Sequence, residues 1–138
     1  MDAESVIETF ELLDNWEARY EFIGDLGREL LPLAAQEKTD ANLVPGCNTP
    51  AWLRGDLSHS EPPTIEFRAD AETPMVRGLM ALLLVPFQGK TPAQILATNA
   101  DSYIARLGLH EHLSPNRREG IDHLIERVRQ IARQFEPG

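Results

Sequence analysis

The stretch TIEFRADAETPMVRGLMALLL, residues 64–84, predicts a strand followed by a buried helix. In its first part, Ile65 and Phe67 alternate with polar residues, which is the period-two pattern of a half-buried strand. Thr73 then supplies an N-cap hydroxyl, and Pro74 occupies the first helical position, where its missing N–H costs nothing. The helix after Pro74 is apolar nearly all round, so we expect it to lie at the centre of the molecule.

Helices are also predicted on both sides of this stretch. Apolar residues recur at helical spacing from the start of the chain, and Asp14 with Glu17 resembles a capping box, so we expect two helices that meet there. The second of them is expected to end at Pro32. Thr91-Pro92 and Ser114-Pro115 mark two later helix starts. The last helix has the clearest apolar stripe, formed by Ile121, Leu124, Ile125, Val128, Ile131, Ala132 and Phe135.

Three short segments in the middle of the chain have the composition of strands. They are residues 43–44, 51–53 and 64–68, and turn-forming residues separate them. We expect a three-stranded antiparallel meander with Cys47 in its first turn. The sequence contains no internal repeat, low-complexity tract or interdomain linker. The predicted fold class is therefore α+β, with residues 1–138 as a single domain in which helices flank a small antiparallel sheet.

The composition fits one folded domain and excludes several classes of protein. Of the 138 residues, 42% are hydrophobic and 25% are charged, and the mean hydropathy is −0.31. The apolar run at residues 79–87 is far shorter than the ~20 residues that a membrane-spanning helix needs, so no membrane association is expected. The first residues lack the basic segment of a secretory signal, which predicts a cytoplasmic location.

Charge is distributed unevenly along the chain. The formal net charge is −9; residues 1–69 hold 14 acidic and 5 basic residues, whereas residues 70–138 hold 8 of each. An acidic surface repels phosphate backbones, so no nucleic-acid partner is expected. The simplest explanation of the acidic excess is a solvated face on the N-terminal helices.

Cys47 is the only cysteine, and it lies in a turn between Pro45-Gly46 and Pro50. A single cysteine excludes an internal disulfide and any metal site that needs two thiolates from this chain. Gly46 allows another backbone or a substrate to approach closely, and N–H groups in a turn can stabilise a thiolate, so a reactive thiol is one interpretation. The other is a buried cysteine that acts as a small hydrophobe. The turn alone leaves both open.

Other candidate groups carry weaker signals. His110 and His112 have a spacing that would bring their rings together only on a strand, and they lead into a helix start, so no metal site is expected. No glycine-rich loop has phosphate-binding spacing. His123 lies close to the apolar stripe of the last helix and is expected to be structural. Arg117 and Arg118 occupy the first turn of that helix, where the helix dipole disfavours positive charge, which indicates some further role.

Several motifs, taken in order, resemble the SufE-type sulfur-acceptor proteins. Residues 44–52 (VPGCNTPAW) are similar to the family's Val-x-Gly-Cys-x-Ser-x-Val-Trp segment. Residues 70–79, which end in VRGL, are similar to its Asp-x-x-x-x-x-Val-Lys-Gly-Leu stretch. Residues 112–117 (HLSPNR), with Gly120 after them, resemble its His-Leu-Ser/Thr-Pro-x-Arg motif, and residues 15–17 (NWE) resemble its N-terminal helices. Together these similarities extend over nearly the whole chain.

The resemblance implies a place in a sulfur relay. In this family a pyridoxal-phosphate cysteine desulfurase removes sulfur from cysteine, the acceptor takes it as a persulfide, and an iron–sulfur cluster scaffold complex receives it. The chain itself would bind no cofactor; its implied partners are the desulfurase and the scaffold, and whether it forms a homodimer is left open. The implied fold is the SufE/IscU-like small sheet flanked by helices. By position, Cys47 is the implied sulfur acceptor, Arg117, Asp70 and His112 are implied supporting residues, and Gly46, Asn48 and Thr49 are implied loop residues.

The segment around Cys47 departs from the family pattern at three positions. Pro45 and Pro50 stand where the family commonly has glutamine, and Thr49 stands in place of serine. Both prolines stiffen the loop and remove an N–H donor. A carrier has to shelter its persulfide, so we expect Cys47 to lie against apolar neighbours at rest and to extend into a partner during transfer.

Three other functions fit the same residues. A paralogous carrier would feed sulfur to another pathway, such as tRNA modification. A non-catalytic adaptor would dock through the acidic N-terminal helices and leave Cys47 inert. A thiol-based redox enzyme would need a resolving thiol from a partner, because this chain has one cysteine.

Overall fold

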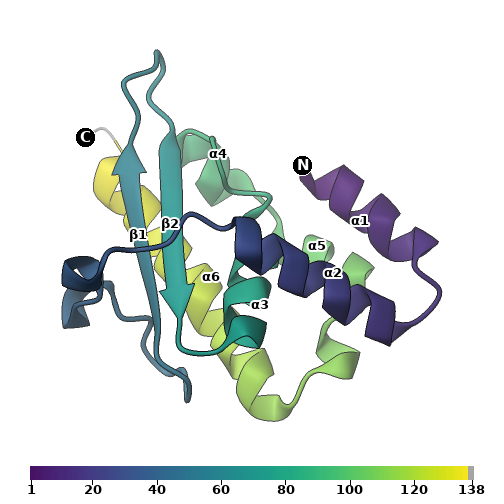
Figure 1. Ribbon diagram of the computed structural model, residues 1–138. Coiled ribbons are helices and arrows are strands. Elements are labelled where there is room, and N and C mark those ends of the chain that lie inside the picture. Colours follow the sequence, from purple (N-terminus) through teal and green to yellow (C-terminus); the bar gives the residue numbers. More distant parts are fainter. Residues whose placement is uncertain (137–138) are drawn as a thin grey trace.

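An antiparallel hairpin and the helix that follows it organise the fold, which is shown in Figure 1 as a computed structural model that describes residues 1–136. Helices α3 and α6 lie behind the hairpin, and α2 lies beside α3. Helices α1 and α5 pack together on the side away from the strands. In chain order the elements are α1 (Ala3–Leu12), α2 (Trp16–Glu29), the 3-10 turns η1 (Ala35–Glu37) and η2 (Asp40–Asn42), β1 (Ala51–Leu57), β2 (Ile65–Ala71), α3 (Pro74–Leu84), α4 (Pro92–Ala97), α5 (Ala100–Leu107), the 3-10 turn η3 (His110–His112) and α6 (Pro115–Phe135).

The two strands pair along their whole length, from Ala51 opposite Ala71 to Leu57 opposite Ile65. One face of the hairpin is buried: Leu53, Ile65 and Phe67 are fully covered. Helix α3 packs against β2 and helix α6 packs against β1, so the apolar face of the sheet and both helices share one core. The α+β class is thus confirmed, and the two longest predicted features, the helix after Pro74 and the last helix, form its centre.

The prediction of three strands is wrong. The first predicted strand, residues 43–44, forms only an isolated bridge between Leu43 and Trp52. The 3-10 turn η2 ends one residue before Leu43, and Pro45 follows two residues after it without an N–H to donate. Gly46 then turns the chain with a φ of 77°. The segment therefore lies beside β1 for the length of one bridge, and the sheet has two strands.

The predicted helix starts follow the local capping chemistry. Thr73, Thr91 and Ser114 each accept a hydrogen bond from a backbone N–H of the first helical turn. The predicted capping box at Asp14 is wrong by one residue: α2 is capped by Asn15, whose Oδ1 accepts from the N–H of Ala18 at 2.8 Å. Asparagine is as good an N-cap as aspartate, so the pattern could not separate the two positions. Helix α5, capped by Asn99, is not predicted by the sequence patterns.

Helices α2 and α3 cross in close contact because each has a glycine at the crossing point. A Cβ placed on Gly27 would lie 2.9 Å from Cα of Gly78, a separation that side chains do not tolerate. The close approach buries Ile23 fully and fixes α3 between α2 and the sheet. Within residues 1–136, no helix combines the length and the hydropathy that crossing a membrane requires.

Candidate functional site

Cys47 lies in the connection between the Leu43 bridge and β1, which we call the Cys47 loop (residues 45–50). Hydrogen bonds hold the loop at its two ends. The N–H of Val44 donates to the carbonyl of Ala51 at 2.8 Å, and the N–H of Glu72 donates to the carbonyl of Pro50 at 3.1 Å. Between these ends, no hydrogen bond of good geometry ties residues 45–49 to the rest of the described chain. The position of the loop therefore depends on how its side chains and Gly46 pack.

The Cys47 loop packs against the first half of α6. Gly46 is in the left-handed region, and a Cβ placed on it would fall on the imidazole of His123, 2.8 Å from Cε1. The backbone angle favours glycine at this position, and any side chain here would displace the His123 ring. One helical turn before His123, Gly120 lies beside the thiol: a Cβ placed on Gly120 would lie 3.7 Å from Sγ of Cys47, an ordinary contact distance.

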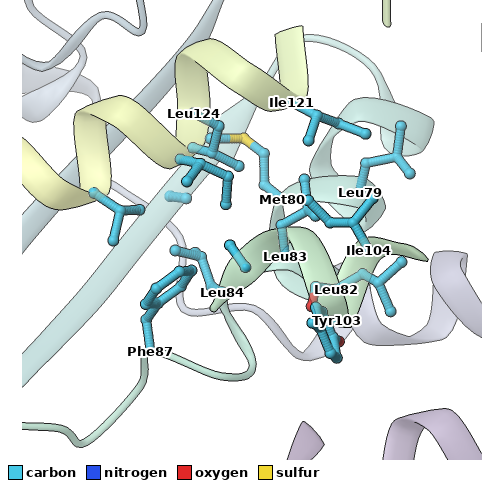
Figure 2. Close-up of a cluster of buried hydrophobic side chains, with 14 of the residues drawn as sticks. Leu79, Met80, Leu82, Leu83, Leu84, Phe87, Tyr103, Ile104, Ile121 and Leu124 are labelled. Atoms are coloured by element: carbon cyan, nitrogen blue, oxygen red, sulfur yellow. The ribbon is translucent and has the colours of Figure 1, made fainter. Parts of the chain in front are cut away.

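A cavity of about 260 Å³ lies under the loop, between α3 and α6. Cys47 is half-buried and lines it. Figure 2 shows part of the apolar wall, with Met80 and Leu83 of α3 pointing toward Ile121 and Leu124 of α6. Its polar rim is formed by Asn48, Thr49, Ser114, Asn116 and Arg117.

Burial raises the pKa of the Cys47 thiol above its usual range. The thiol is therefore protonated at neutral pH while the loop is in this position. A protonated thiol is a poor nucleophile, because the thiolate is the form that attacks sulfur. The geometry thus describes a sheltered cysteine that reacts slowly where it lies.

The sequence that forms this site and the surrounding fold matches a known family. A family model described as SufE, the Fe-S metabolism associated domain, matches residues 4–132. The chain belongs to the SufE family. A role in iron–sulfur metabolism follows from this membership.

Individual relatives agree with the SufE assignment. An uncharacterized SufE-like protein from Rhizobium etli is 35% identical over 131 residues, which are 94% of this chain and 88% of the relative. The solution structure of a hypothetical protein from Thermus thermophilus matches with a TM-score of 0.77 at 19% identity, covering 96% of this chain and 93% of that one. At that identity the likeness shows the fold alone.

The structure brings several of the predicted SufE-type site residues together. Cys47, Asn48, Thr49 and Arg117 line the same cavity, and Gly46 shapes the turn above it. Helix α6 positions Arg117 in its first turn, directly after the Ser114 cap. The role of these residues in sulfur chemistry stays a prediction.

Asp70, by contrast, does not line the cavity. It is 3% exposed near the end of β2, where Arg77 donates to it through Nε at 3.0 Å and Lys38 pairs with it at 3.1 Å. Burial by itself would raise the pKa of Asp70, but the hydrogen bonds from Arg77 and Lys38 outweigh it and hold that pKa below its usual range. In this position Asp70 fixes the start of α3 and the segment before the Cys47 loop to the sheet.

His112 also lies outside the cavity lining. It is in the 3-10 turn η3, and its ring stacks on Trp16 with the ring centres 3.9 Å apart. Its carbonyl accepts a hydrogen bond from the Tyr20 hydroxyl at 2.9 Å. His112 thus joins η3 to α2, which leaves its predicted supporting role without a contact at the cavity. No cluster of three or more metal-ligating side chains occurs in the part of the chain that the structure describes.

Sequence reasoning missed the placement of His123. The sequence predicts a structural residue close to the apolar stripe, but His123 is exposed on α6 and its ring faces Gly46 of the Cys47 loop. Gly120 and His123 are three residues apart, so they lie on the same side of the helix. A glycine inside a long helix was the one available signal that something packs closely there.

Proposed function

We propose that this SufE-family protein carries sulfur as a persulfide on Cys47. It takes the sulfur from a pyridoxal-phosphate cysteine desulfurase and passes it to an iron–sulfur cluster scaffold. The observation that supports this most is the placement of the only cysteine: it is half-buried over an apolar cavity, in a loop held by packing alone between its ends. Such a site shelters a reactive sulfur at rest and can release it.

The transfer itself follows the rules of thiol–disulfide exchange. The Cys47 thiolate attacks the outer sulfur of the partner's persulfide, and a bond forms between Sγ and that sulfur. The sulfur–sulfur bond of the partner breaks, and the partner's cysteine leaves as a thiolate. The transferred sulfur keeps its oxidation level, so the step needs no external oxidant or reductant.

The resting geometry requires the loop to move for this step. In the cavity the half-buried Cys47 thiol is held protonated by burial. Extension of the loop removes the apolar surroundings and lets the thiol ionise against the partner's site. Arg117, on the rim of the cavity, carries a positive charge that can stabilise an anionic sulfur at the moment of release or return.

The test is intact-protein mass spectrometry after incubation with a cysteine desulfurase, pyridoxal phosphate and L-cysteine without reductant. The wild type is expected to gain about 32 Da, the mass of one sulfur atom, and Cys47→Ser to gain nothing. A thermal melt of Cys47→Ser serves as the control for folding.

If the wild type gains no sulfur with several desulfurases, including one from the same organism, the proposal is wrong. Binding of the desulfurase without any sulfur uptake would then favour a non-catalytic adaptor.

A further inference from the structure

The Cys47 loop packs on the core through Cys47 and on α6 through Gly46. The loop has hydrogen bonds only at its ends, through Val44 and Pro50. In between, α6 meets the loop through the ring of His123, on which a Cβ placed at Gly46 would fall. Gly120, one turn earlier, leaves the thiol uncrowded, since even a Cβ placed there would lie at an ordinary distance of 3.7 Å from Sγ of Cys47. The ring of His123 is therefore a side chain of α6 that packs directly on the loop.

His123 is not needed elsewhere in the fold. It is exposed and lies outside the hydrophobic core, whereas its neighbours Leu124 and Ile125 are buried. The far edge of its ring, which includes Nε2, is what meets Gly46. No hydrogen bond of this ring is formed within residues 1–136, so its interaction with the loop is packing against a glycine backbone.

We propose that His123 is a positioning residue for sulfur transfer: its imidazole packs on Gly46 and holds the Cys47 loop in the cavity until a partner displaces it. This inference rests on the proposed function for its role in transfer, but the packing can be tested on the isolated protein. A group that holds the closed state lowers the fraction of molecules with an open loop. It therefore weakens the apparent affinity for any reagent or partner that needs Cys47 extended.

The first measurement is the rate of Cys47 alkylation by iodoacetamide at pH 8. We expect His123→Ala to react about fivefold faster than the wild type, because opening of the loop limits the reaction. His123→Phe keeps a flat ring but cannot exchange a proton, and it is expected to react at nearly the wild-type rate.

Two matched variants control for other effects of the substitution. Asp122→Ala, at the neighbouring exposed position of α6, raises helix propensity by about as much as His123→Ala does. His59→Ala removes the same side chain from an exposed position between the strands. Both are expected to alkylate at the wild-type rate, and all variants are expected to keep the wild-type melting temperature within a few degrees.

The second measurement uses the desulfurase. His123→Ala is expected to lower the KM for this protein by the same factor by which it speeds alkylation, with kcat unchanged, because the ring is displaced before the chemistry.

The outcomes separate the two proposals. An unchanged alkylation rate in His123→Ala, or an equal increase in His123→Phe, overturns the role of the ring as a packing group. A fall in kcat with unchanged KM also overturns it, since it would place the ring in the chemical step. Absence of sulfur uptake by wild type and variants alike, with the alkylation difference intact, would contradict the sulfur-carrier function and leave the packing role standing.

Discussion

Two loops of this molecule have similar compositions and are held in different ways. The turn between the strands (residues 58–64) and the Cys47 loop each contain two prolines and at least two polar residues. In the first, the N–H of Ser58 donates to the carbonyl of Thr64 at 2.8 Å, and their hydroxyls are hydrogen-bonded at 2.9 Å. In the second, residues 45–49 have no such bonds to the described chain and rest on α6.

The difference shows that two segments with flanking prolines can be tied to the rest of the fold by different kinds of contact. A proline restricts its own φ, but the position of a loop depends on what the whole segment contacts. Release of the Cys47 loop breaks packing against one helix, while its anchors at Val44 and Pro50 can stay formed. On the proposed function, the loop would leave and return without loss of backbone pairing.

Asp70→Asn is expected to give the largest loss of stability of the variants considered. It tests whether the contacts that hold the sheet also hold the Cys47 loop. The side chain is buried between Arg77 and Lys38, so removal of its charge should lower the free energy of unfolding by about 2–3 kcal/mol at pH 7, measured by urea denaturation. Alkylation of Cys47 under native conditions should stay unchanged, because the cavity that Cys47 lines is formed by α3 and α6 and is not lined by Asp70.

The same variant has a defined pH dependence. The pKa of Asp70 is lowered in the folded protein, so its contribution is present above the unfolded pKa of about 3.9 and is lost as the pH falls through the folded value. The stability difference between wild type and Asp70→Asn should therefore shrink in acid.

The alkylation rate of Asp70→Asn provides the contrary outcome. If it rises as far as in His123→Ala, the ion pairs of Asp70 with Arg77 and Lys38 shelter Cys47 as well.

Ser58→Ala tests the turn between the strands, which is the hydrogen-bonded one of the two loops. It removes the hydroxyl that bonds to Ser60 at 2.7 Å and Thr64 at 2.9 Å, and should lower the free energy of unfolding by about 1 kcal/mol without changing the alkylation rate. Ser102→Ala, at an exposed position of α5, is the matched control and should change little. Equal stability of the two variants would mean that the hydrogen bonds of the turn contribute nothing.

Gly120→Ala is expected to have the smallest effect, and in the opposite direction. Alanine is favoured over glycine inside a helix, so the free energy of unfolding should rise by about 0.5–1 kcal/mol. The added methyl would contact Sγ at 3.7 Å, so Cys47 should stay covered and alkylate no faster than in the wild type. Gly24→Ala in α2 is the matched control for helix propensity, because its methyl would meet only Arg28, at 3.9 Å. If Gly120→Ala is alkylated faster and Gly24→Ala is not, the added methyl displaces the thiol from the cavity.

What could be predicted from the sequence is mostly what neighbouring residues decide. The caps at Thr73, Thr91 and Ser114 involve residues within one helical turn, and all three helices begin there. The pairing of residues 43–44 with β1 depends instead on the direction that η2 and the turn at Gly46 give to the chain. The predicted strand is a single bridge. Alternation of polar and apolar residues cannot report such a turn.

The candidate site divides in the same way. The Gly46-Cys47 turn could be recognised from adjacent residues, and Arg117 from a motif that follows a helix cap. The contact between His123 and Gly46 joins residues far apart in the sequence, and the helical pattern around His123 only places it near an apolar stripe. Which of the exposed residues of a helix meets a loop depends on tertiary packing.

The size of the cavity has a consequence for how the loaded and empty forms of such a carrier compete for the desulfurase. Its volume of about 260 Å³ is several times the roughly 30 Å³ that one water molecule occupies in the liquid, so one added sulfur atom fits without displacing the loop. On the proposed function, the loaded and the empty protein then present the same outer surface. A desulfurase that recognises this surface binds both forms equally well. Accumulated loaded carrier would act as a product inhibitor, and turnover would be paced by the next acceptor in the relay.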